Sequence, residues 1–385
     1  MTFHERILTL EDDPVAGRLA PVAAPDVERA LAGPFVSPDG FRALLSPAAG
    51  PVLERAAGCA HALTVQHFGR VILLYTPLYL SNFCGNACRY CGFAAANPIK
   101  RSRLTMPEVE EEARLIGAMG FHHVLVLTGD SRMMSPVEYI GDCVEILRNH
   151  FSSIAIEVYA LETAEYAQLV DAGVDSLTIY QETYDRGRYA EVHPGGPKRN
   201  YRFRLEAPER ACKAGVRSVN LGVLLGLGDW RRDVFLLGLH ADYLQRLHPD
   251  VEVSISLPRL RPHRGSFEPE CEVTDREFAS ALVALRLFLP RVGITISTRE
   301  SATLRDHLIP LGVTTMSAGS STSVRGHLDP SAEPPQFDIS DRRDVPAVRR
   351  AIEAAGYKAI FKDWQPLGER SRAEGTGRRA GGALP

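Results

Sequence analysis

Three cysteines lie within eight residues of one another, at Cys84, Cys88 and Cys91, with the spacing C-x3-C-x2-C. Thiolates this close in sequence can surround only one compact centre, so a metal ion or an iron–sulfur cluster is expected. A closed 4Fe–4S cluster takes four cysteines and a structural zinc site takes four ligands, so three thiolates leave one iron open. An open iron can bind a substrate or a cofactor, and the sequence therefore predicts a reaction centre.

The residues between these cysteines argue against a simple packed loop, because Gly85, Asn86, Arg89 and Gly92 make the segment polar and bendable. The other four cysteines lie singly in apolar or helical surroundings, and we expect them to be inert packed thiols: Cys59, Cys143, Cys212 and Cys271. An odd and clustered set of seven cysteines is not typical of a disulfide framework, and it favours a reducing cytoplasm.

The composition of the 385 residues, with 45% hydrophobic and 24% charged side chains, is typical of a globular enzyme. A formal net charge of −3 gives no electrostatic footprint for nucleic acid or for an anionic membrane. No apolar run approaches the roughly 20 residues needed to cross a bilayer, and the polar start of the chain does not resemble a secretory signal. We therefore expect neither a nucleic-acid partner nor a membrane partner.

The cysteines directly follow the first of eight short runs rich in β-branched and apolar residues. The runs are Val71–Leu80, His123–Leu127, Ile154–Ala160, Ser176–Tyr180, Val219–Leu225, Val253–Leu257, Ile294–Ser297 and Val313–Ser317. Helical stretches separate them, at Met106–Met119, Pro136–Arg148, Thr163–Ala172, Leu205–Ala214, Asp233–Leu247, Asp275–Leu289 and Ser301–Ile309. Strands that alternate with helices in this way predict an α/β fold, a TIM-type (β/α)8 barrel.

We expect four regions along the chain. A helical extension covers residues 1–70, with a loosely ordered lead-in over residues 1–20, and the barrel covers residues 71–320. A C-terminal segment, residues 321–367, packs on the barrel, and residues 368–385 form a disordered tail. The Ser320–Gly326 stretch reads as a loop over the barrel mouth.

Barrel active sites lie at the C-terminal ends of the strands, above a packed interior, so the residues that follow each run are the candidates for chemistry. Thr128-Gly129-Asp130 offers backbone carbonyls and a carboxylate that would suit an ammonium group, although a Gly-Asp pair is also common in plain turns. Glu157 is a charge inside an apolar run and needs a partner, either a residue or a ligand hydroxyl. Glu182, after the fourth run, offers the same chemistry.

Two arginines near strand ends could bind carboxylates. Arg204 opens a helical stretch and could pair with a carboxylate in a bidentate manner, or form a structural salt bridge. Arg299 and Ser317 follow adjacent strands and would form a clamp for an amino acid, unless Arg299 pairs with Glu300 or Asp306. The alternating glycines of Gly222–Gly228 would let a flat ring lie on the backbone, or would serve close packing.

Taken together, these residues resemble the radical S-adenosylmethionine (SAM) superfamily, whose hallmark C-x3-C-x-Φ-C, with Φ aromatic, is matched by Tyr90 before Cys91. Further blocks resemble the 2-iminoacetate synthases (tyrosine lyases) of thiamine thiazole biosynthesis. They are Pro77–Asn82, Cys91–Phe93, Ile99–Arg101, Tyr180–Tyr184, Arg204–Pro208, Pro258–Pro262, Ser297–Ser301 and Lys362–Trp364. The resemblance covers about residues 25–365.

The resemblance implies a 4Fe–4S cluster on the three cysteines, with SAM on the fourth iron. It places Tyr90 near the adenine, Thr128, Gly129 and Asp130 at the SAM amino group, Glu157, Glu182 and Arg204 at its other polar atoms, and Gly226 in the adenine-side wall. It further implies Tyr79, Arg299 and Ser317 as contacts of the substrate's amino acid portion. One electron from flavodoxin or ferredoxin would start cleavage of the Cα–Cβ bond of L-tyrosine to 2-iminoacetate and p-cresol, with thiazole synthase as a partner.

Three alternatives bear on this interpretation. The related tryptophan lyase shares the scaffold, and the choice between tyrosine and tryptophan depends on pocket shape. The hydrogenase-maturation tyrosine lyase carries a second cluster on C-terminal cysteines, whereas no cysteine follows Cys271 here. A non-catalytic electron carrier or structural iron–sulfur protein would use four protein ligands and a small fold, neither of which matches this chain.

Overall fold

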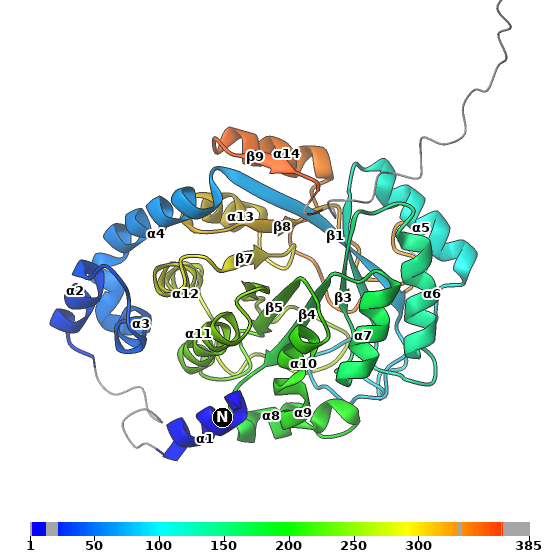
Figure 1. Cartoon of the computed structure of the whole chain (residues 1–385), viewed down its shortest axis with the longest axis horizontal. Coiled ribbons are helices and arrows are strands. Elements are labelled where there is room, and N and C mark those ends of the chain that lie inside the picture. The colour runs from blue at the N-terminus through cyan, green and yellow to red at the C-terminus, as the bar shows by residue number, and fades with distance from the viewer. Residues whose placement is uncertain (1, 13–21, 330–332, 363, 365–385) are drawn as a thin grey trace, which may run out of the picture.

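The computed structural model describes residues 2–12, 22–329, 333–362 and 364, and it contains a closed parallel barrel with helices on its outside (Figure 1). The predicted tail, residues 368–385, lies outside the described residues. The barrel strands are β1 (Val71–Ser81), β2 (His123–Thr128), β3 (Ser153–Glu157), β4 (Ser176–Glu182), β5 (Ser218–Val223), β6 (Glu252–Ser256), β7 (Gly293–Ile296) and β8 (Thr315–Ser317). All neighbouring pairs are parallel, and the pairing of β1 with both β8 and β2 closes the ring. The fold prediction is confirmed.

Helices connect the strands around the barrel. They are α5 (Met106–Ala118), α6 (Val137–Leu147), α7 (Thr163–Ala172), α8 (Arg186–Val192), α9 (Tyr201–Leu205), α10 (Ala207–Lys213), α11 (Trp230–Leu247), α12 (Asp275–Phe288) and α13 (Ala302–Leu308), with short 3-10 turns η2 (Pro197–Arg199) and η3 (Ile309–Leu311). Capping boxes fix the starts of α5 and α12: Thr105 faces Glu108 in one, and Thr274 faces Glu277 in the other. These starts hold the loops that enter the helices from the barrel mouth. No described helix is long and apolar enough to cross a membrane.

The N-terminal region consists of α1 (Phe3–Asp12), α2 (Ala24–Ala32), α3 (Pro38–Leu45), η1 (Pro47–Val52) and α4 (Leu53–Phe68). Helices α3 and α4 pack against α12 on the outside of the barrel (Figure 1). The expected loose lead-in is wrong over α1, because Phe3 and Ile7 lie one helical turn apart and both are buried. Phe3 stacks on the ring of His240 in α11, with 4.1 Å between ring centroids. This contact ties the start of the chain to the barrel.

The connection from β4 to α10 is longer than the sequence patterns indicated, since α8, η2 and α9 precede α10. A register shift interrupts the β4–β5 pairing between Tyr180 and Glu182. Glu182 has a φ of 71°, in the left-handed region that non-glycine residues rarely adopt. Such backbone strain is typical of residues at functional sites. Here it occurs at the last residue of β4, which is Glu182.

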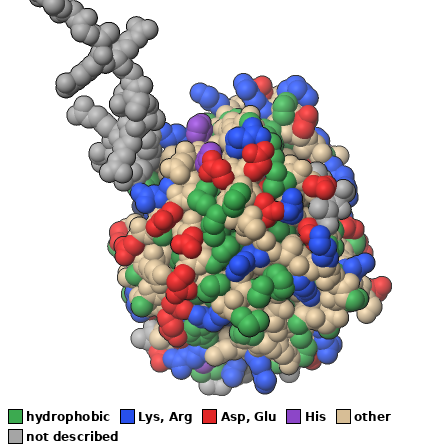
Figure 2. Space-filling view, turned by 90° about the vertical axis from the view of Figure 1, so that its right-hand side faces the viewer, with side chains coloured by type: hydrophobic (Ala, Val, Ile, Leu, Met, Phe, Trp, Pro, Cys, Tyr) green, Lys and Arg blue, Asp and Glu red, His purple; other side chains and the backbone are tan. Residues whose placement is uncertain are grey.

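The C-terminal region folds back on the barrel through α14 (Val345–Ala354) and β9 (Lys358–Ile360). Strand β9 pairs in parallel with the start of β1, outside the closed ring. Before α14, the backbone N–H groups of Ser340 and Asp341 donate to the Thr298 carbonyl at the end of β7, at 2.8 and 3.1 Å. The face shown in Figure 2 has acidic and basic side chains interspersed with hydrophobic ones.

Candidate active site

A cavity of about 170 Å³ lies at the C-terminal ends of the barrel strands. Thirteen of the predicted site residues line it: Tyr79, Cys84, Cys88, Tyr90, Cys91, Thr128, Gly129, Asp130, Glu157, Glu182, Arg204, Arg299 and Ser317. They come from strands and loops across the whole barrel, so the fold gathers residues that are far apart in sequence. Gly226 is not among the lining residues; it lies against Leu260 and Pro269.

The loop that carries the cysteines is fixed by Asn86, a residue to which the sequence assigned no specific role. The Asn86 amide donates to Asp130 Oδ2 at 2.7 Å, and its carbonyl oxygen accepts from the Lys198 backbone N–H at 2.8 Å. The Gly85 N–H donates to the Asp130 carbonyl at 2.8 Å. One buried side chain thus joins the cysteine loop to the loops that follow β2 and β4.

The donor set fits an iron–sulfur cluster. All three thiols open onto the same cavity, Cys88 is buried, and Cys84 and Cys91 are half-buried. Among the described residues, no three His, Cys, Asp or Glu side chains converge at the spacing of a single metal ion; a cluster several ångströms wide needs thiolates spread around it instead. Burial raises the pKa of Cys88 to about 12 and also raises that of Cys84, so ligation by these residues would displace protons.

Glu182 lies between two cations at the end of β4. Its carboxylate accepts from Lys198 Nζ at 2.6 Å and lies 3.8 Å from the Arg204 guanidinium, while Arg204 Nε donates to the Tyr180 carbonyl at 2.7 Å. Burial alone would raise the pKa of Glu182, but the charges of Lys198 and Arg204 hold that pKa below its usual value. Of the two roles that the sequence allowed for Arg204, the structure shows a salt bridge, with Glu182. Arg204 also lines the cavity.

Tyr90 contacts two polar side chains at the edge of the cavity. Its hydroxyl lies 2.6 Å from His193 Nε2, and the Lys198 ammonium lies 5.5 Å from the centre of its ring. Tyr90 packs against a small apolar cluster formed by Val192, Leu224 and Leu227. Tyr90 and this cluster form an apolar wall, with His193 and Lys198 as polar neighbours. The resemblance places the adenine on this side.

The glycine in the middle of β5 has a packing explanation. A Cβ on Gly222 would lie 2.4 Å from the ring of Tyr180, so only glycine leaves room for that ring. The ring that lies on the backbone at Gly222 is therefore that of Tyr180 and not that of a ligand. Tyr180 lines the bottom of the cavity.

Glu157 points into the cavity from the end of β3. Burial, together with the nearby charge of Glu182, raises its pKa to about 7, and the positive charges of Arg299 and Arg204 act in the opposite direction. Within the described part of the chain, its carboxylate makes no hydrogen bond. A carboxylate in this setting is available to a ligand hydroxyl or ammonium group.

We expect Glu157→Gln to stabilise the ligand-free protein more at pH 8 than at pH 5.5. The pKa of Glu157 is about 7 in the folded state, against 4.5 for a glutamate that is free in water. Between these values the folded state holds a proton that the unfolded state lacks, so the free energy of unfolding falls as pH rises towards 7. The gain from the substitution should be about 2 kcal/mol larger at pH 8.

Urea denaturation at the two pH values measures this difference. Glu145→Gln, on the exposed face of α6, is the matched control and should change stability equally at both. An equal effect of Glu157→Gln at pH 5.5 and pH 8 would show that this carboxylate is not destabilised by burial.

Arg299 has no carboxylate partner within ion-pair distance in the described ranges. Of the two predicted alternatives, Glu300 pairs with Arg259, and Asp306 pairs with Arg343 at 2.9 Å. The Arg299 guanidinium instead lies 3.4 Å from the centre of the Phe337 ring. Its charge is therefore positioned by stacking and remains available to an anionic ligand.

Ser317 is held beside Arg299 by the neighbouring backbone. Its hydroxyl accepts from the Thr298 N–H at 3.0 Å, and its carbonyl accepts from the guanidinium of the buried Arg305. Arg305 in turn pairs with the buried Asp341. The C-terminal segment thereby supports the end of β8.

Three lining residues come from the C-terminal segment: Thr322, which lies in the expected Ser320–Gly326 loop, and Gln336 and Phe337, both of which sequence reasoning missed. Lys198, in η2, was missed as well. None of these residues follows a strand, so the strand-end rule could not find them. The only available signal was the expectation that residues 321–367 pack on the barrel.

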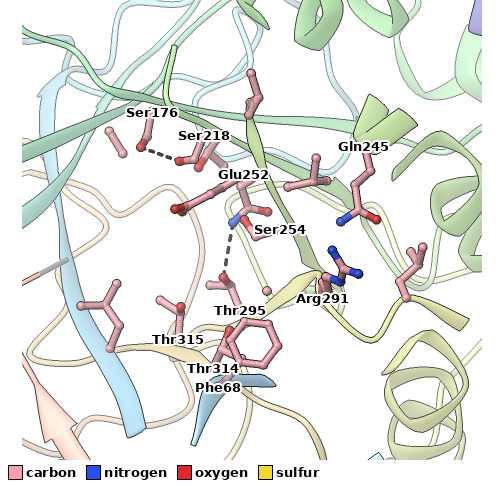
Figure 3. Close-up of a pocket in the computed structure, with 18 of the residues that line it drawn as sticks. Phe68, Ser176, Ser218, Gln245, Glu252, Ser254, Arg291, Thr295, Thr314 and Thr315 are labelled. Carbon is pink, nitrogen blue, oxygen red and sulfur yellow. Dashed lines mark hydrogen bonds between the residues drawn. The ribbon is translucent and has the colours of Figure 1, made fainter. Parts of the chain in front are cut away.

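A second, larger cavity of about 890 Å³ occupies the opposite half of the barrel, where a packed interior was expected (Figure 3). Its lining includes bulky side chains such as Leu73 and Leu177, and it also includes six small hydroxyl residues: Ser176, Ser218, Ser254, Thr295, Thr314 and Thr315. The Ser176 and Ser218 hydroxyls lie 2.6 Å apart. Tyr75, Leu125 and Tyr180 line both cavities and separate them.

Comparison with known proteins agrees with this geometry. Residues 78–237 match the Radical SAM superfamily, and residues 256–358 match the Biotin and Thiamin Synthesis associated domain. The chain is 40% identical to 2-iminoacetate synthase of Escherichia coli over 94% of its own length and 97% of that protein. It is 27% identical to 3-methylornithine synthase of Methanosarcina barkeri over 80% of this chain and 85% of that protein.

Solved structures show the same architecture. The [FeFe]-hydrogenase maturase HydG of Carboxydothermus hydrogenoformans superposes with a TM-score of 0.82 and 29% identity, over 93% of this chain and 82% of that one. Methylornithine synthase (PylB) superposes with a TM-score of 0.70 at 23% identity, over 87% and 97%, which supports the fold alone.

A three-cysteine loop at the mouth of a (β/α)8 barrel, together with these matches, defines a radical SAM enzyme, which uses a 4Fe–4S cluster and SAM. Within this superfamily, the chain belongs to the 2-iminoacetate synthase family. The resemblance inferred from the sequence is confirmed.

Proposed function

We propose that this enzyme cleaves the Cα–Cβ bond of L-tyrosine to give 2-iminoacetate and p-cresol, for the thiazole of thiamine. The observation that carries the proposal is a single cavity that joins three cluster-ligand cysteines to a stacked, unpaired arginine. The family relationship, at 40% identity over 94% of the chain, supports the same reaction.

The cofactors would supply the difficult step: a bound 4Fe–4S cluster, reduced by one electron, would provide with SAM the radical chemistry that removes a hydrogen atom from the substrate. Cys84, Cys88 and Cys91 would hold the cluster. Thr128, Gly129 and Asp130 would receive the amino group of SAM, and Glu157, Glu182 and Arg204 would bind its remaining polar atoms. Tyr90 would lie near the adenine; Gly226, outside the cavity lining, would support this wall from behind.

Arg299 and Ser317 would hold the carboxylate of the substrate, with Tyr79 beside them. Arg299 offers planar N–H donors and is already oriented by Phe337, so little side-chain freedom is lost on binding. Tyr79 is buried and lines the cavity, and its ring packs edge-on against the Phe93 ring, with 5.9 Å between ring centroids. The amino acid would then lie between the ends of β7 and β8 and the proposed cluster ligands.

We further propose flavodoxin or ferredoxin as the electron donor, thiazole synthase as the partner that receives 2-iminoacetate, and the cytoplasm as the compartment. All seven cysteines are free thiols, which is the state that a reducing compartment maintains.

Product analysis tests the reaction. Protein reconstituted anaerobically with iron and sulfide, and given SAM, dithionite and tyrosine, should release p-cresol and 5′-deoxyadenosine in parallel. Tryptophan in place of tyrosine is the comparison, because the tryptophan lyase shares the scaffold. An indole product from tryptophan with no p-cresol from tyrosine would overturn the substrate assignment and leave the radical SAM assignment intact.

A further inference from the structure

Gln336 lies in the C-terminal segment, and its backbone is fixed against the cysteine loop. Its N–H donates to the Thr322 carbonyl at 2.9 Å, and its carbonyl accepts from the Gly92 N–H at 3.0 Å. A Cβ on Gly92 would lie 2.5 Å from the Gln336 carbonyl oxygen, so glycine beside Cys91 permits this close approach. The segment therefore docks directly on the residue that follows a cluster ligand.

The Gln336 side chain forms a bridge inside the cavity. Its carbonyl oxygen accepts from the Tyr79 hydroxyl at 2.8 Å, and its amide nitrogen donates to Cys91 Sγ at 3.5 Å. A carboxamide has one acceptor end and one donor end. Because the Tyr79 phenol donates to the acceptor end, the donor end faces the sulfur, which is the arrangement that a negatively charged thiolate requires.

We propose that Gln336 is a positioning residue that raises the reduction potential of the cluster through its N–H···S hydrogen bond, with Tyr79 orienting the amide. Reduction adds one negative charge to the cluster and its thiolates, and a hydrogen bond to a ligand sulfur stabilises the more negative state. The residue touches a cluster ligand and not the reacting atoms, so its effect appears in the potential. The proposal rests on the 4Fe–4S cofactor, and it does not depend on which amino acid is cleaved.

The bridge also joins two parts of the site with separate roles. Cys91 belongs to the cluster loop, whereas Tyr79 lies on β1 beside the proposed amino acid subsite. A change at Tyr79 should therefore reach the cluster through Gln336. This link gives a second variant, on strand β1 rather than in the cysteine loop, that tests the same hydrogen bond.

The test is a redox titration of the reconstituted full-length protein, followed by electron paramagnetic resonance, without SAM or amino acid. For Gln336→Leu we expect the ratio of reduced to oxidised cluster at a fixed potential to fall about tenfold, a shift of about 59 mV to lower potential for a one-electron couple. Gln336→Glu places a carboxylate at the sulfur and should shift the potential further in the same direction. Tyr79→Phe keeps the ring, frees the amide, and should give a smaller shift of the same sign.

Gln245→Leu is the matched control, because Gln245 lies at the other cavity, at the opposite end of the barrel (Figure 3). It should leave the potential unchanged. Iron and sulfide contents are measured for every variant, so that loss of the cluster is separated from a change in its potential.

Wild-type potentials in Gln336→Leu and Tyr79→Phe, with full iron content, would overturn the proposal. If Gln336→Leu does not retain a cluster, Tyr79→Phe decides the matter: a lower potential supports the bridge, and an unchanged one rejects it. Failure of tyrosine cleavage in the wild-type protein would affect the proposed function and leave this titration unaltered.

Discussion

Cys88→Ala, reconstituted anaerobically, should bind no stable 4Fe–4S cluster and should form no detectable 5′-deoxyadenosine or p-cresol. Cys88 is the most buried of the three cysteines, at 5% exposure. Apart from Cys84 and Cys91, no cysteine lines the cavity and could replace it. With two thiolates left, two irons would lack protein ligands, and the site would no longer define a single open iron. Iron content, the visible absorption spectrum and product analysis measure the three losses.

The matched control is Cys59→Ala, which removes an exposed thiol from α4. It should retain the cluster and full activity. SAM cleavage by the Cys88→Ala protein at a rate near that of the wild type would mean that the three cysteines are not the ligand set.

Arg299→Ala should weaken the binding of the amino acid about 100-fold while SAM still binds. No carboxylate of the described residues lies within ion-pair distance of Arg299, and a charge-assisted, bidentate contact with a ligand carboxylate is worth about 3 kcal/mol. Arg299→Lys should recover only part of the affinity, because an ammonium lacks the planar pair of donors and the stacking on Phe337. Substrate titrations of initial rate, with SAM saturating, give the KM for each variant.

Arg246→Ala removes an exposed arginine that pairs with Asp242 within α11, and it serves as the control. It should leave KM unchanged. A KM for Arg299→Ala equal to that of the wild type would place the carboxylate subsite elsewhere in the cavity.

The strand-end rule explains how much of the site the sequence could predict. Cys84, Glu157 and Ser317 each follow or end a recognisable apolar run, and a parallel barrel brings such positions to one rim whatever lies between them. The patterns of β1 to β8 were clear because buried parallel strands are rich in β-branched residues. The barrel and cavity residues of this kind could therefore be predicted without tertiary contacts, whereas Tyr79 and Tyr90 were implied by the family resemblance.

The residues that were missed lie in segments without periodicity. Lys198 sits in a short turn, and Gln336 lies between prolines and a phenylalanine, where no local pattern reports a tertiary partner. Their positions depend on contacts far apart in sequence, such as the hydrogen bond from Gly92 to Gln336. The cavity in the lower barrel was missed for a related reason: threonine is enriched in strands as valine is, so the strand pattern does not show where side-chain volume is lost.

The segment that supplies Gln336, Phe337 and Asp341 also affects the order of events during biosynthesis. All eight barrel strands precede residue 318, whereas the parts that cover Cys91 and Arg299 come later in the chain. A growing polypeptide can thus close its barrel on the ribosome while the chamber above the thiols is still open. The segment made after the eight strands then covers Cys91 and Arg299.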